Sequence, residues 1–162
     1  TAPDAARSDF KYVRGMSESA MALEGPRGLP LTKPPYGRVT AFDMTKGEIA
    51  WQIPHGDGIR QQLIDMGIPD PGPVGSGSST GPLLTKTLLF FGQGSRTSRV
   101  ENSASKPLFR ALDKRTGATV YQMALRAAPS GTPMTYLANG KQYIAFAVGG
   151  GPEAGIMALA LP

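Results

Sequence analysis

The side chains of this sequence that could act as acids, bases or metal ligands are few and widely spaced. There is one histidine, His55, and there is no cysteine. His55 has no pair of carboxylates at metal-ligand spacing around it, so neither a transition-metal site nor a Ser-His-Asp triad is indicated. Asp57, Asp65 and Asp70 follow His55, but their spacing is wrong for a calcium loop. We therefore expect a surface or loop-bracing role for His55.

A glycine-rich stretch, residues 72–81, is the next pattern that could bind a ligand. It lacks the Gly-Lys-Ser/Thr ending of a phosphate-binding loop, and it leads into an apolar run typical of a strand instead of a helix. Phosphate binding is therefore not indicated. The excursion from Gly56 to Gly77 is rich in proline and glycine, and one role open to it is that of a substrate lid.

Composition favours a turn-rich β protein. The 162 residues include 21 glycines and 15 prolines, with 40% hydrophobic and 18% charged residues. The net charge is +5, but the basic residues are scattered, so no nucleic-acid partner is expected. The longest apolar stretches are too short to cross a bilayer as helices. The first residues lack an initiator Met and a signal pattern, so we expect a mature N-terminus or a cut inside a longer protein.

A repeated hairpin organises the chain. Residues 41–52 (AFDMTKGEIAWQ) return as residues 111–122 (ALDKRTGATVYQ), with Ala, Asp, Gly and Gln in the same places. Each copy predicts a strand that ends at Asp43 or Asp113, a tight turn closed by a glycine, and a second strand. Because an Asp at the start of a turn accepts hydrogen bonds from the turn's own amides, both acids are predicted to be structural.

A second repeated unit supplies two more strands. It begins at Thr80-Gly81-Pro82 and again at Gly131-Thr132-Pro133, and both copies continue into apolar runs. Asn139-Gly140 is a strong two-residue hairpin signal within the later copy. Together with the Asp-Gly hairpins, these units give four strands in regular order, which is the pattern of a propeller blade.

We therefore predict an all-β fold, a partial β-propeller of about two and a half four-stranded antiparallel blades, with the whole chain as one propeller fragment. Open blades would leave unpaired edges, so we expect either missing N-terminal blades or self-association through those edges. The predicted division is a partial strand and long loop in 1–36, strands C and D of one blade in 37–53, the excursion in 54–79, a full blade in 80–125, and strands A to C of the last blade in 131–162.

Seven short motifs add a family resemblance that covers the chain from about residue 9 to its end. They are residues 28–31 (GLPL), 33–38 (KPPYGR), 47–54 (GEIAWQIP), 81–90 (GPLLTKTLLF), 131–136 (GTPMTY), 140–143 (GKQY) and 158–162 (ALALP). In this order they resemble the C-terminal region of membrane-bound quinoprotein dehydrogenases of the glucose, quinate and polyol type. In that family the Asp-Gly hairpin carries a tryptophan-docking motif, which implies that Trp51 packs between blades. Lys46 and Tyr121 depart from the motif, which implies a looser belt of aromatic residues at the second copy.

The resemblance implies an eight-bladed propeller with pyrroloquinoline quinone (PQQ) on its axis, a Ca²⁺ ion that polarises the quinone, and an Asp that takes the proton of the substrate hydroxyl. It places that Asp and the metal ligands upstream of this chain. This chain would then contribute small residues at the cofactor face, where backbone amides and hydroxyls can approach a planar ligand. The alternative is that these residues merely begin strands. The candidate cofactor-binding residues are Ser79, Thr80, Gly81 and Pro82 in one blade and Gly131, Thr132 and Pro133 in the next.

The resemblance further implies oxidation of a sugar, polyol or alcohol, with electrons passed to a respiratory quinone or cytochrome, by a periplasmic, membrane-associated protein. On its own the chain is expected to bind no cofactor tightly and to be inactive. The alternative is a non-catalytic propeller of similar repeats that serves as a scaffold for protein assembly at the outer membrane.

Overall fold

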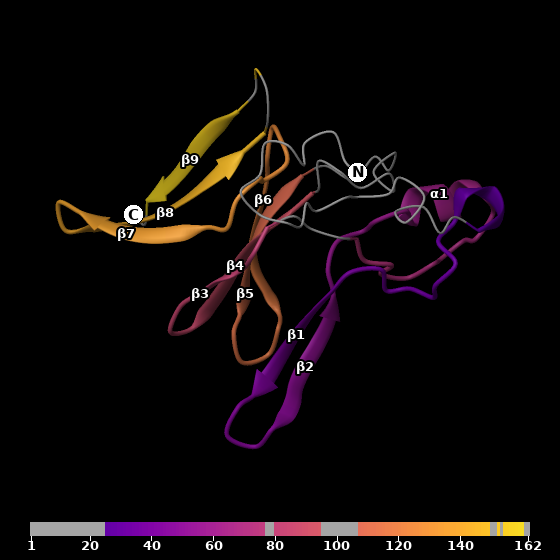
Figure 1. Cartoon of the computed structure of the whole chain (residues 1–162), viewed down its shortest axis with the longest axis horizontal. Coiled ribbons are helices and arrows are strands. Elements are labelled where there is room, and N and C mark those ends of the chain that lie inside the picture. Colours follow the sequence, from indigo (N-terminus) through magenta and orange to yellow (C-terminus); the bar gives the residue numbers. More distant parts are fainter. Residues whose placement is uncertain (1–24, 77–79, 95–106, 150–151, 153, 161–162) are drawn as a thin grey trace, which may run out of the picture. The chain divides into compact units, whose positions relative to one another are not determined.

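The computed structural model describes residues 25–76, 80–94, 107–149, 152 and 154–160 (Figure 1). The chain divides into two compact units, Thr1–Lys33 and Pro34–Pro162. In the described part of the first unit, a single 3-10 turn, η3 (Pro26–Gly28), is closed by a hydrogen bond from the amide of Leu29 to the carbonyl of Pro26. All strands considered below belong to the second unit. The possible strand at residues 9–14 lies outside the described residues.

In its described residues, the second unit has three antiparallel sheets, and their strands follow one another along the chain (Figure 1). The first sheet pairs β1 (Arg38–Asp43) with β2 (Glu48–Pro54). The second has the order β3 (Leu83–Leu84), β4 (Leu88–Gln93), β5 (Leu108–Asp113) and β6 (Thr119–Ala124). The third has the order β7 (Met134–Ala138), β8 (Lys141–Val148) and β9 (Gly155–Ala160). The expected all-β architecture is confirmed.

The repeated hairpins β1–β2 and β5–β6 are built alike. Each has a bulge at the same place, between Ala41 and Phe42 in one and between Ala111 and Leu112 in the other. The Asp that ends the first strand accepts the turn amides, so its predicted structural role is confirmed. Asp43 accepts the amides of Thr45 and Lys46 at 3.0 and 3.2 Å, and Asp113 accepts those of Arg115 and Thr116 at 3.0 and 2.9 Å.

The residue before the turn glycine is Lys46 in the first hairpin and Thr116 in the second. The Thr116 hydroxyl donates a further hydrogen bond of 2.9 Å to the Asp113 carboxylate. This side-chain bond is the largest of the effects that hold the pKa of Asp113 below its usual value, ahead of the bonds from the turn amides. Lys46 cannot donate in the same way, so the first turn has two bonds to its Asp where the second has three.

The second sheet lies between the other two and packs against both. Because side chains alternate along a strand, Leu89 and Phe91 of β4 face the first sheet, where they form a core cluster with Leu112 against Val39, Trp51 and Ile53. Phe90 and Phe109 face the third sheet, in a second cluster with Ile144 and Phe146. There the rings of Phe109 and Phe146 stack with centroids 4.2 Å apart and planes 9° apart. Both faces of the middle sheet are therefore apolar, as expected for a blade between two neighbours.

Trp51 joins the first sheet to the second. Its indole N–H donates a 2.9 Å hydrogen bond to the carbonyl of Lys114, in the turn between β5 and β6. Its ring covers Gly117, so closely that a Cβ on this glycine would lie 2.8 Å from the nearest ring atom. The docking expected of Trp51 is thus confirmed. Tyr121, its counterpart in the second hairpin, is 54% exposed.

The outer sides of the first and third sheets carry exposed apolar side chains. Phe42 and Ile49 project from the first sheet, and Met134 and Ile156 from the third, where Ile156 is 79% exposed. The excursion between the first two sheets is less irregular than expected, because a short helix, α1 (Arg60–Asp65), forms there with Leu63 buried. No helix in the described part of the chain is long and apolar enough to span a membrane.

Candidate ligand-binding site

One edge of the layer between the first and second sheets is polar. β2 ends at this edge with Pro54, and β4 ends there with Gln93. Because β4 and β5 are antiparallel, β5 begins at the same edge, where Leu108 pairs with Gln93. Along the β4 face that points at the first sheet, the side chains change from Leu89 through Phe91 to Gln93. The chemistry of this layer therefore passes from an apolar core to a polar edge.

His55 stands at this edge and is held by its backbone from two sides. Its amide donates a 2.9 Å hydrogen bond to the carbonyl of Gly37, and its own carbonyl accepts one of 2.5 Å from the amide of Ser76. Its ring meets Phe91 edge to face, with centroids 4.7 Å apart and planes 64° apart. With only 6% of its surface exposed, His55 is not the surface residue that was one of the two expectations. His55 braces its loop through its backbone hydrogen bonds, and these bonds do not involve its ring.

The polar atoms around His55 lack partners. Five buried nitrogen and oxygen atoms have no hydrogen-bond partner among the described residues. They are both ring nitrogens of His55, both polar atoms of the Gln93 amide, and the Nε of Arg110. Gln93 is 2% exposed. Arg110 is the β5 residue directly opposite Phe91 in the strand register. Buried polar atoms are nearly always paired, so five atoms without a partner on three neighbouring side chains mark a place where the described residues leave hydrogen bonds unmade.

Burial keeps the His55 ring neutral at physiological pH. The pKa is lowered to about 4, first by loss of water around the ring and then by the positive charge of Arg110, while the Gly92 backbone opposes the shift. That backbone does not complete a hydrogen bond of good geometry with either ring nitrogen. A neutral imidazole offers one donor and one acceptor.

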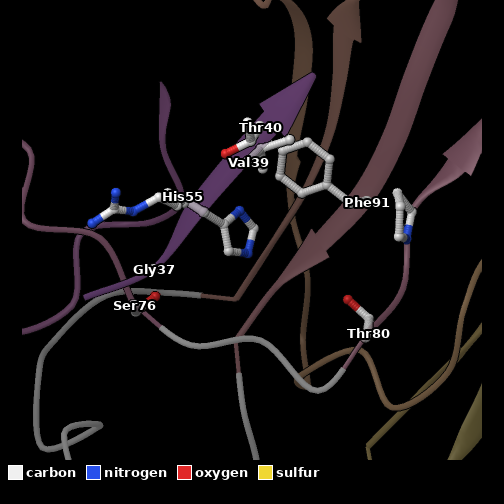
Figure 2. A pocket seen from close by; sticks show the side chains of 9 residues that line it. Gly37, Val39, Thr40, His55, Ser76, Thr80 and Phe91 are labelled. Atoms are coloured by element: carbon white, nitrogen blue, oxygen red, sulfur yellow. The ribbon is translucent and has the colours of Figure 1, made fainter. Parts of the chain in front are cut away.

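A pocket of about 320 Å³ opens beside His55. Figure 2 shows the imidazole with Val39, Thr40 and Phe91 above it and Ser76 and Thr80 below it in this view, and all five residues line the pocket. The residues that line it are Gly37, Arg38, Val39, Thr40, His55, Ser76, Thr80, Pro82 and Phe91. The lining includes one cation and no carboxylate.

The candidate cofactor-binding residues are divided by the structure. Thr80 and Pro82 line the pocket, and the Thr80 hydroxyl donates to the carbonyl of Gly92 at 3.1 Å. Gly81 turns to the other side, where its amide donates a 3.2 Å hydrogen bond to the hydroxyl of Thr132. The segments preceding β3 and β7 are thus brought together, although they lie far apart in sequence.

Of the remaining candidates that the structure describes, none lines the pocket. Pro133 is buried, Gly131 is half-buried, and Ser79 lies outside the described residues. Gln93 and Arg110 were not among the candidates, because both stand in strands predicted as core. The signal that could have found them is a polar side chain at a position where strand alternation calls for an apolar one. Among the described residues, no group of three His, Asp or Glu side chains could hold a metal ion.

The comparisons with known proteins place this chain in a family. A family model described as "PQQ: Glucose/ethanol/alcohol dehydrogenase, beta-propeller domain" matches residues 3–144. The chain therefore belongs to this family of β-propeller domains. The expected family resemblance and the partial propeller fold are thereby confirmed.

The two relatives matched by sequence agree with this assignment. The chain is 34% identical over 157 residues to the glycerol dehydrogenase large subunit of Gluconobacter thailandicus, spanning 88% of this chain and 20% of that protein. It is 33% identical over 129 residues to the quinate/shikimate dehydrogenase (quinone) of Acinetobacter baylyi, spanning 76% of this chain and 14% of the other. The quinohemoprotein alcohol dehydrogenase from Comamonas testosteroni aligns with a TM-score of 0.49 at 23% identity, over 76% of this chain and 14% of that one. The chain thus spans a fifth or less of the length of these proteins.

The buried His55 should make stability depend on pH. The unfolded chain takes up a proton at His55 near pH 6.5, whereas the folded protein does so only near pH 4. The free energy of unfolding is therefore expected to fall as the pH decreases from about 6.5 to about 4, by at most about 3 kcal/mol. Urea unfolding of the wild type and of His55→Gln at pH 7 and at pH 4.5 tests this. The variant should lose less stability than the wild type over this range, and equal losses in both proteins would contradict the expectation.

Proposed function

We propose that this chain is part of a PQQ-dependent dehydrogenase that oxidises a hydroxyl group of a polyol, sugar or alcohol by hydride transfer to the quinone. The observation that carries the proposal is the PQQ propeller-domain match over residues 3–144. The relatives named for glycerol and quinate oxidation support the substrate class. The propeller docking of Trp51 supports the same reading, because it joins consecutive sheets as blades.

In this proposal the role of the chain is to complete the propeller and to shape part of the cofactor face. Trp51 and the stacked Phe109 and Phe146 lock the sheets together. The blade boundaries predicted from the sequence stay part of the proposal, with the exposed apolar side chains of the first and third sheets covered by further blades. Substrate chemistry belongs to other parts of the protein.

PQQ, when bound, supplies the carbonyl group that accepts the hydride. The residues of this chain that we propose near it are those preceding β3 and β7, namely Ser79, Thr80, Gly81, Pro82, Gly131, Thr132 and Pro133. The contact between Gly81 and Thr132 supports their common placement, and Thr80 and Pro82 line the pocket beside His55. Among the described residues, no three His, Asp or Glu side chains lie close enough together to hold a metal ion, and we assign no step of the reaction to a metal held by this chain. We further propose a periplasmic, membrane-associated location and electron transfer to a respiratory quinone or cytochrome.

The test is oxidation by the natural protein, purified and reconstituted with PQQ and Ca²⁺. Glycerol, quinate, glucose and a simple alcohol are each supplied, and reduction of an artificial electron acceptor is followed by absorbance. We expect acceptor reduction with at least one substrate and none when PQQ is omitted. The isolated chain of 162 residues should show no turnover. Failure of the natural protein with every substrate would refute the proposed activity.

A further inference from the structure

The turn between β7 and β8 consists of Asn139 and Gly140, and both residues are exposed. Their φ values are 51° and 75°, as a two-residue hairpin turn requires, and Ala138 pairs with Lys141 directly beside it. Figure 1 shows this turn at one end of the third sheet. Further blades that cover the two faces of that sheet would leave such a turn in contact with water.

An asparagine followed by glycine can lose its side-chain amide without an enzyme. The deprotonated backbone nitrogen of Gly140 attacks the side-chain carbonyl carbon of Asn139, and as this C–N bond forms the bond to the side-chain nitrogen breaks and ammonia leaves. Water then opens the resulting five-membered succinimide. Opening at the side-chain carbonyl gives aspartate, and opening at the backbone carbonyl gives isoaspartate, in which the chain runs through Cβ. One water is consumed, one ammonia is released, and nothing is oxidised or reduced.

The groups that take part in this reaction are free in the folded protein. Among the described residues, neither the Asn139 side chain nor the Gly140 amide makes a hydrogen bond. A Cβ on Gly140 would meet nothing within 4 Å, so this glycine has room to rotate toward the Asn139 side chain. The turns of the other two hairpins differ, because Asp43 and Asp113 each accept hydrogen bonds from the amides of their own turn.

Asp57 and Gly58 form a packed counterpart within the same chain. An aspartate before a glycine can form the same succinimide, with loss of water instead of ammonia. Gly58 is buried, however, and a Cβ on it would overlap the carbonyl oxygen of Gly75. The carbonyl of Asp57 also accepts a 2.9 Å hydrogen bond from the amide of Arg60. The rotation that the reaction needs is therefore blocked at Gly58 and open at Gly140.

Isoaspartate at this turn would disturb the third sheet, because the length of a two-residue turn fixes the register of its strands. The modified residue adds one carbon to the backbone of the turn. In the present register Tyr136 pairs with Tyr143, and their rings stack with centroids 5.1 Å apart and planes 10° apart. The same strand, β8, places Phe146 in the core cluster against the second sheet.

We propose that Asn139 is a site of spontaneous deamidation in the folded protein, and that the isoaspartate formed there loosens the pairing of β7 with β8. The inference goes beyond the proposed function and does not depend on it, because it rests on the chemistry and exposure of one turn.

The experiment compares natural protein kept folded at pH 9 and at pH 6 with a sample kept at pH 9 in urea. Trypsin releases Asn139 in peptide 127–141 and Asp57 in peptide 47–60. Deamidation adds one mass unit to the first peptide, and an isoaspartyl methyltransferase labels isoaspartate in either one.

At pH 9 the folded protein should deamidate Asn139 at a rate within about tenfold of that in urea, because the end of a hairpin opens at little cost. The rate should be much lower at pH 6, since the attacking nitrogen must be deprotonated. Asp57 should form isoaspartate at least about a hundredfold more slowly in the folded protein than in urea, because its glycine is packed.

Two variants separate the loss of the amide from its effect on the sheet. Asn139→Gly keeps a residue that accepts positive φ, and it should show no mass change in peptide 127–141 and no loss of stability on incubation. Asn139→Asp adds the new charge to an unmodified backbone, and when fresh it should unfold at the same urea concentration as the fresh wild type. The wild type aged at pH 9 should unfold at a lower urea concentration than either variant.

Retention of the Asn139 amide in the folded protein at pH 9 would overturn the proposed site. Isoaspartate at Asp57 forming as fast in the folded protein as in urea would contradict the argument from packing. An aged wild type that carries isoaspartate but unfolds like the fresh protein would refute the loosening of the sheet.

Discussion

Replacing Trp51 with alanine is expected to lower the free energy of unfolding by about 3 kcal/mol or more. The indole is the link between the first two sheets, because it packs on Leu89, Phe91 and Leu112 and donates to the Lys114 carbonyl. Its removal leaves a cavity in this layer and an unpaired carbonyl. Since Trp51 is the only tryptophan of the chain, unfolding in urea must be followed by circular dichroism.

Trp51→Phe is the matched control for that substitution. It keeps an aromatic ring in the layer and loses the indole N–H, so we expect a loss of about 1 kcal/mol. If alanine and phenylalanine cost the same, the hydrogen bond to Lys114 and not the packing would be the main contribution. If neither variant lowers stability, Trp51 does not join the sheets.

Gly117→Ala is expected to cost about 3 kcal/mol, for two separable reasons. Gly117 has φ of 75°, where a side chain is strained, and a Cβ there would lie 2.8 Å from the Trp51 ring. Gly47 occupies the same place in the first hairpin with φ of 72° and nothing within 4 Å of its Cβ position. Gly47→Ala should therefore cost only the backbone strain, about 1 kcal/mol.

The difference between these two glycine variants measures the docking contact directly. In a Trp51→Ala background the ring is absent. There Gly117→Ala should lower the free energy of unfolding by only as much as Gly47→Ala does. Urea unfolding of the four variants provides the comparison. Equal costs for the two glycines in the wild-type background would contradict the packing of the indole on the turn.

The sequence predicts the hairpins and the docking of Trp51 because both depend on local chemistry that repeats. The Asp-to-amide bonds, the positive φ of Gly47 and Gly117 and the alternation of β4 all follow from residue types at fixed spacing. The order of strands in the second sheet is also predictable from the sequence, because strands that are consecutive in the chain pair with each other.

The gathering of the polar side chains of His55, Gln93 and Arg110 at one edge could not be predicted in the same way. The burial of His55 depends on the return of the excursion at Ser76, a contact between segments with no shared pattern. Gln93 and Arg110 occupy ordinary strand positions, and only the packing of two sheets shows that they face the same layer. Helix α1 was missed because six residues are too few to display a helical period. Which of the strand-start residues, Ser79 to Pro82 and Gly131 to Pro133, touch a cofactor stays a prediction.

The central claim is that this chain belongs to a working quinoprotein. Its most direct test is to free the natural protein of cofactor and to titrate it with PQQ in the presence of Ca²⁺. Binding is followed by tryptophan fluorescence and by quinone absorbance. We predict saturable binding with a fixed stoichiometry. A non-catalytic propeller scaffold would give no saturable change in either signal, and that result would contradict the account.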